Sequence, residues 1–149
     1  MANPKRRLPI SEIIGELANI KTKQGKIEWL KAHDSIPLRQ VLRINYDSSV
    51  EWLLPDTPPP WKNNPVDDAQ RDGLFYTETR RLKIFIKDGG YNDLNQVKRE
   101  GLFISLLEDL DNADAKLLST MLAKKPFKGL TLKTLEEAFP NVLQTKIVG

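Results

Sequence analysis

The sequence lacks cysteine altogether and contains a single histidine, His33, which removes several classes of chemistry. Without thiols the chain can form no disulfide, no thiolate metal site and no cysteine nucleophile. One imidazole cannot build a histidine metal cluster, and His33 lies in the polar stretch "KAHDS", which is typical of an exposed turn between helices. We therefore expect no bound metal, no cofactor and no catalytic residue.

Long apolar runs are also missing, so no segment is suited to crossing a membrane. The basic start "MANPKRRLPI" is not followed by the apolar stretch of a signal peptide. The 23 basic and 20 acidic residues among 149 are ordinary for a globular chain with one core. We expect a soluble, cytoplasmic, single-domain protein.

Strands are poorly supported, because apolar residues recur at helical spacing and rarely alternate with period two. The sequence predicts an all-α domain of about seven or eight helices over residues 10–143, between a flexible basic arm (1–9) and a tail (144–149). A long helix is expected before the glycine pair of "KDGG" (87–90), and a short helix around Val50, Trp52 and Leu53. Further helices are expected to begin at caps, namely Ser11, Asn112 and Thr131.

The stretch "PDTPPPWKNNP" (55–65) cannot be helical, because its prolines lack amide donors and favour extended neighbours. One interpretation is a rigid surface crossing with Trp61 packed on the core. The other is a polyproline ligand for the aromatic groove of a partner protein.

Positive charge is concentrated in two regions. Residues 5–43 hold nine basic and four acidic groups. In "KKPFKGLTLK" (124–133), three lysines precede Gly129, and Thr131 is placed to cap a helix. A glycine lets the backbone approach a phosphate, and a helix start favours an anion. Such lysines give salt-sensitive binding to nucleic acid, although lysines also decorate ordinary helix junctions.

Two stretches together resemble a known family. These are "SEIIGELANIKTKQGKIEWLKAHDSIPLRQVLRINYDSSVEWLL" (11–54) and "AKLLSTMLAKKPFKGLTLKTLEEAFPNVL" (115–143), roughly half of the chain. They look like the N-terminal DNA-binding domain of ATP-dependent DNA ligases of the T-even phage type, and the chain is also similar to small proteins of T4-like cyanophages.

The resemblance implies a helical domain that contacts the minor groove and the sugar-phosphate backbone of duplex DNA. The implied phosphate-contacting residues are Lys124, Lys125, Lys128, Gly129, Thr131 and Lys133, to which we add Lys21, Lys23 and Lys26 from the first basic region. Ligation itself is not expected, because the K-x-D-G motif that carries the adenylated lysine is absent and "KDGG" has the wrong order.

Two hypotheses follow. The first is a non-enzymatic, monomeric accessory protein of phage replication, repair or recombination, acting in the host cytoplasm and gripping double-stranded or nicked DNA through its backbone. The second is a helical interaction adaptor or host-takeover factor without DNA affinity. It would bind a sliding clamp, another replication protein or a host protein through Trp61 and Trp52, because aromatic residues dominate interface hot spots.

Overall fold

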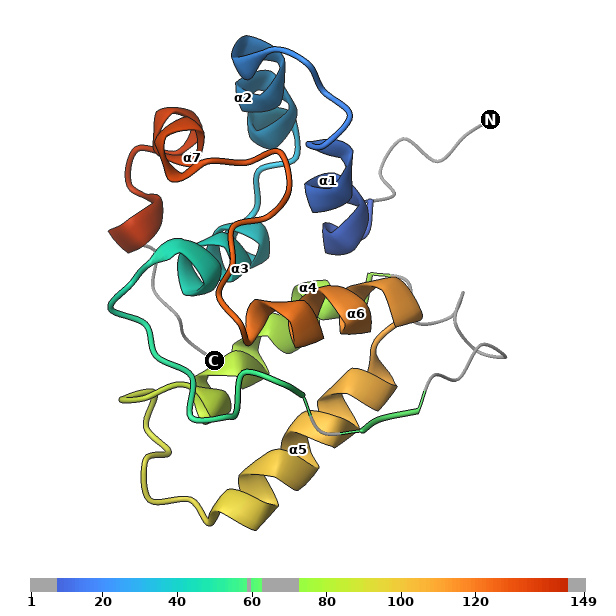
Figure 1. Ribbon diagram of the computed structural model, residues 1–149, viewed down its shortest axis with the longest axis vertical. Helices are drawn as coiled ribbons and strands as arrows, with labels where there is room; N and C mark the ends of the chain where they lie inside the picture. The colour runs from blue at the N-terminus through green and yellow to red at the C-terminus, as the bar shows by residue number, and fades with distance from the viewer. Residues whose placement is uncertain (1–7, 59, 63–72, 145–149) are drawn as a thin grey trace.

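Seven α-helices run through the part of the chain that the computed structural model describes, residues 8–58, 60–62 and 73–144 (Figure 1). They are α1 (Ile10–Glu16), α2 (Lys23–Ala32), α3 (Ile36–Tyr46), α4 (Phe75–Glu78), α5 (Gln96–Asp109), α6 (Asn112–Met121) and α7 (Leu132–Ala138). Two 3-10 helices, η2 (Thr79–Phe85) and η3 (Val142–Gln144), complete the set. The prediction of one all-α domain is confirmed. Most of the predicted arm and tail lies outside the described residues.

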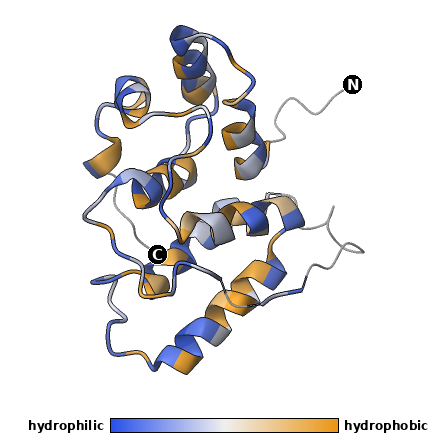
Figure 2. Ribbon diagram, viewed as in Figure 1, coloured by the Kyte–Doolittle hydropathy of each residue, from blue (hydrophilic) through white to orange (hydrophobic). Residues whose placement is uncertain are grey.

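Helix α3 is at the centre of the fold. It packs on α4, η2 and η3, and its residues Leu38, Val41, Leu42 and Ile44 are completely buried. Figure 1 shows α1, α2 and α7 on one side of α3, with α4, α5 and α6 on the other. Hydrophobic and hydrophilic residues alternate along these helices (Figure 2), as expected for amphipathic helices that share one core. No helix among the described residues is long and apolar enough to cross a bilayer.

Two helix predictions are wrong, and one interaction explains both. The segment around Trp52 is extended rather than helical, and it forms an antiparallel bridge with Ile86. The Leu53 amide donates to the Phe85 carbonyl, and the Lys87 amide to the Glu51 carbonyl, each at 2.8 Å. This pairing ends the predicted long helix, which is instead divided into α4 and η2.

The helix caps follow the sequence only in part. Thr131 caps α7 as predicted, since its hydroxyl accepts from the Thr134 amide at 3.2 Å. The cap of α6 is Asp111 rather than Asn112, and α1 begins at Ile10, so Ser11 lies inside its first turn. The Ser11 amide is capped from elsewhere, by the Asp114 carboxylate at 2.9 Å.

Asp111 and Asp114 form a buried acidic pair where the first turns of α1 and α6 meet. The two residues are 5% and 0% exposed, and Asp111 also accepts from the Asp114 amide at 2.8 Å. The second carboxylate oxygen of each has no hydrogen-bond donor among the described residues. Burial, reinforced by the charge of Asp111, raises the pKa of Asp114 to about 7, although hydrogen bonds from Ser11 oppose the shift. A proton on Asp114 would supply the missing donor.

Stability should therefore fall as pH rises through neutrality. Folding raises the pKa of Asp114 from 3.8 to about 7. The stabilisation that protonated Asp114 gives the folded state is therefore fully present below pH 3.8 and is lost above pH 7. Asp114→Asn, which stays neutral and can still accept from Ser11, should raise the free energy of unfolding at pH 8 by about 2 kcal/mol, with little gain at pH 4. Urea unfolding of this variant and of the exposed control Asp93→Asn tests it, and equal gains at both pH values would contradict it.

Gly129 packs directly on the end of the first helical segment. Its φ of +86° lies in the left-handed region. A Cβ atom there would stand 2.7 Å from the Leu17 carbonyl oxygen and 2.8 Å from the Ala18 Cα atom. Both constraints require glycine, and they hold the segment before α7 against the backbone that follows α1.

Gly129→Ala should therefore destabilise the fold by roughly 1–3 kcal/mol, because the added carbon meets backbone and the dihedral becomes strained. The matched control is Gly101→Ala, at an exposed position within α5 where an added Cβ meets nothing within 4 Å. That control should stabilise by about 0.5–1 kcal/mol through helix propensity. Thermal unfolding measures both, and a neutral effect at Gly129 would show that this contact is not formed.

Candidate functional site

The connection between α6 and α7 carries the lysines that the sequence singled out, and we call residues 124–130 the basic loop. Lys124 begins it with a φ of +53°, which is uncommon outside glycine. Its ammonium turns inward and donates to the carbonyl oxygens of Asp47, at 2.5 Å, and of Val50, at 2.6 Å. Burial lowers the pKa of Lys124, while the Asp47 charge opposes this shift. Lys124 therefore neutralises the carbonyl end of α3 rather than facing solvent.

Two side chains at the end of α3 hold the rest of the basic loop. The Tyr46 hydroxyl donates to the Leu130 carbonyl at 2.6 Å and accepts from the Phe127 amide at 2.8 Å. The Asn45 amide donates to the Lys125 carbonyl at 3.0 Å. Burial raises the pKa of Tyr46 to about 12, so the phenol keeps its proton at ordinary pH. Three polar contacts from Asn45 and Tyr46 thus fix the backbone of the loop.

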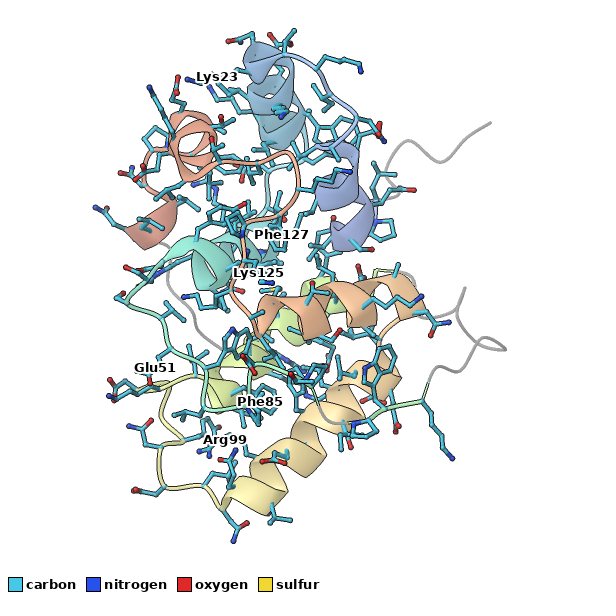
Figure 3. The ribbon with its side chains drawn as sticks, in the orientation of Figure 1. Lys23, Glu51, Phe85, Arg99, Lys125 and Phe127 are labelled. Carbon is cyan, nitrogen blue, oxygen red and sulfur yellow. The ribbon has the colours of Figure 1, made fainter. Side chains whose placement is uncertain are left out.

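With its backbone fixed, the loop points Lys125 and Lys128 outward. Both side chains are exposed, and neither forms an ion pair with another described residue. Figure 3 shows Lys125 and Phe127 on the stretch of chain that passes α3 on its way to α7. Between the two lysines, Phe127 is half-buried and its ring lies 5.8 Å from that of Tyr46. These are the two lysines of the basic loop whose ammonium groups are accessible.

The other residues of that predicted turn have mixed positions. Gly129 packs against the backbone of Leu17 and Ala18, so this side of its own backbone is not open to a ligand. The Thr131 hydroxyl caps α7. Lys133, in the first turn of α7, is exposed. In the first basic region, Lys21 is exposed and Lys26 is half-buried, whereas Lys23 forms an ion pair with Glu137 of α7.

The two basic regions come close to one another at the end of α1 and along α7. Gly129 contacts the backbone of Leu17 and Ala18, close in sequence to Lys21, and α2 packs along α7. Two further basic residues of this region, Arg39 and Arg43, form ion pairs with Asp34 and Asp47. Arg39 forms a bidentate ion pair with Asp34 at 2.6 Å and 2.7 Å and stacks on the Phe139 ring at 4.6 Å.

The two tryptophans of the adaptor hypothesis differ in position. Trp52 is 8% exposed, its indole donates to the Met121 carbonyl at 3.0 Å, and its ring meets Phe103 edge-on. It is a core residue and offers no surface for a partner. Trp61 is half-buried against the core, as the surface-crossing interpretation predicted. Residues 59 and 63–65 of the proline-rich stretch lie outside the described residues.

Sequence reasoning missed Asn45 and Tyr46, which hold the basic loop, and the inward turn of Lys124. The motif "RINYD" gives no local sign that its amide and phenol reach residues about 80 positions later. The phenylalanine inside "KKPFK" is a usable signal, since an aromatic between lysines is a pattern of nucleic-acid binding. Within the described residues, no group of three or more potential metal ligands gathers.

Comparison with known proteins gives a family but no function. No curated protein and no solved structure matches the chain. Residues 13–127, well over half of the chain, match DUF6433, which is a family of unknown function, and the match ends before Lys128 of the basic loop. The protein is therefore a member of the DUF6433 family.

Proposed function

We propose that this protein is a non-enzymatic DNA-binding accessory factor that grips the phosphate backbone with its basic loop. The observation that carries the proposal is the pair of outward lysines, Lys125 and Lys128, on a backbone that Asn45 and Tyr46 hold in place. Lys21 and Lys133 are also exposed, and we include them among the proposed DNA-contacting residues. The ligand is duplex or nicked DNA, in keeping with the resemblance of residues 115–143 to the DNA-binding turn of ligases.

The mechanism is electrostatic and preorganised. A fixed loop presents two ammonium groups without the entropy cost of ordering its backbone on binding. Each phosphate that they neutralise releases condensed counterions, so affinity depends steeply on salt. Contacts to phosphate position a protein but do not read bases, and the factor therefore has slight sequence preference. This activity suits a monomer that assists replication, repair or recombination of phage DNA in the host cytoplasm.

The adaptor hypothesis retains less support. Trp52 is in the core, and Trp61 has part of its ring packed on the protein itself. No observation among the described residues indicates a particular protein partner. Binding to a replication or host protein without DNA affinity is therefore the outcome that a negative DNA result would favour.

Reversing the charge of Lys125 and Lys128 tests the proposal. Lys125→Glu with Lys128→Glu should abolish measurable binding to a fluorescein-labelled blunt duplex at low salt, because two attractive charges become repulsive. In the wild type, log K should fall with log salt concentration. Changing both lysines to glutamine should reduce that slope by about 2, one unit for each phosphate that is no longer neutralised. Fluorescence anisotropy over a salt series measures both effects.

The matched control is Arg80→Glu with Lys98→Glu, which makes the same change in net charge at two exposed positions on η2 and α5. This control should bind with nearly wild-type affinity if the basic loop is the contact. Equal losses in both double variants would mean that only net charge matters. No binding by the wild type at low salt would remove the proposal.

A further inference from the structure

A groove beside the basic loop is not explained by contacts to a duplex backbone. It has a volume of about 460 Å³ and lies between the loop and the start of the proline-rich stretch, at Asp56, Thr57 and Pro58. Pockets of this size accommodate small ligands. Lys125 and Lys128 both line it, so the groove is part of the proposed phosphate-binding surface rather than a separate feature.

The groove combines three kinds of chemistry. Phe127, with Pro58 and Pro126, supplies an apolar lining. Lys125 and Lys128 supply positive charge, and Asp56 supplies a carboxylate. A ligand that satisfies all three needs a flat apolar surface, a negative group and a hydrogen-bond donor.

We propose that this groove holds one unpaired nucleotide of a DNA strand. The base packs on Phe127, the flanking phosphates lie on Lys125 and Lys128, and Asp56 accepts from an amino group on the base. This inference rests on the proposed DNA binding and names its preferred substrate, which is DNA with an overhang, a gap or a frayed end. Aromatic contact with bases combined with lysines along the backbone is the physical basis of single-strand binding.

Contacts with Tyr46 hold Phe127 in place before a ligand binds. Its amide donates to the Tyr46 hydroxyl at 2.8 Å, and its ring rests against the Tyr46 ring with centroids 5.8 Å apart. The side chain is therefore positioned before a ligand arrives, which lowers the entropy cost of binding. A paired base could not use it, since its faces are covered by the neighbouring base pairs.

An acidic peptide fits the groove less well than a nucleotide does. Its carboxylates could reach the lysines, but they would meet repulsion from Asp56, a carboxylate that favours a hydrogen-bond donor beside it. The exocyclic amino groups of adenine, cytosine and guanine supply such a donor on the same molecule that carries the phosphate. The presence of two lysines and one carboxylate in the same lining thus favours the nucleotide.

The test compares two labelled DNAs at one salt concentration, a blunt duplex and the same duplex with a five-nucleotide overhang. The wild type should bind the overhang about tenfold more tightly. Phe127→Leu, which keeps apolar volume but removes the ring, should lose most of this preference while its affinity for the blunt duplex changes little. Phe127→Ala should lose it as well. The control Tyr91→Ala, at an exposed aromatic away from the groove lining, should keep the full preference.

Thermal unfolding of each variant shows whether it is folded, and Phe127→Leu remains informative if Phe127→Ala is not. Equal binding of the two DNAs, or an unchanged preference in Phe127→Leu, would overturn the inference and leave the proposed function standing. Absence of binding to both DNAs would overturn both. Displacement of the overhang by a polyglutamate peptide, with no effect of Phe127→Leu, would also overturn the inference and assign the groove to an acidic protein segment.

Discussion

The ammonium of Lys124, held by the carbonyl oxygens of Asp47 and Val50, joins the end of α6 to the end of α3. The carbonyl end of a helix carries partial negative charge, and the half-buried ammonium of Lys124 donates to two carbonyl oxygens there. This contact fixes the point at which the chain leaves α6. Every later feature of the basic loop, from the Tyr46 hydrogen bonds to the fit of Gly129 on α1, depends on that starting position.

The contact of Lys124 with Asp47 and Val50 gives the neighbouring lysines of the loop two different roles. Lys124 is engaged in holding the loop, whereas Lys125 and Lys128 face solvent. Fixing the loop also fixes Phe127 between them, in the lining of the groove that Asp56 shares. The proposed function and the proposed preference for an unpaired nucleotide rest on the same structural feature, a loop whose backbone is bonded to α3 and whose lysines remain accessible.

The sequence predicted the helical class and the cap of α7, but it did not predict the long-range contacts. Helical spacing identified the amphipathic helices, and Thr131 was recognisable as a cap because it precedes its helix directly. The bridge between Trp52 and Ile86 was missed, since isolated strand pairing leaves no periodic pattern. The inward turn of Lys124 was also missed, because lysine is usually exposed and its partners are 74 and 77 positions away. The position of the candidate site could be predicted from the sequence. The different roles of Lys124, which holds the loop, and of Lys125 and Lys128, which are exposed, could be seen only in the structure.

The most direct test of this account is amine-selective acetylation of the native protein, read residue by residue by mass spectrometry, with and without duplex DNA. The account predicts fast acetylation of Lys125 and Lys128 in the free protein, strong protection of both by DNA, and slow acetylation of Lys124 in either state. Equal reactivity of Lys124 and Lys125 in the free protein, or no protection of Lys125 and Lys128 under conditions where DNA is bound, would contradict it.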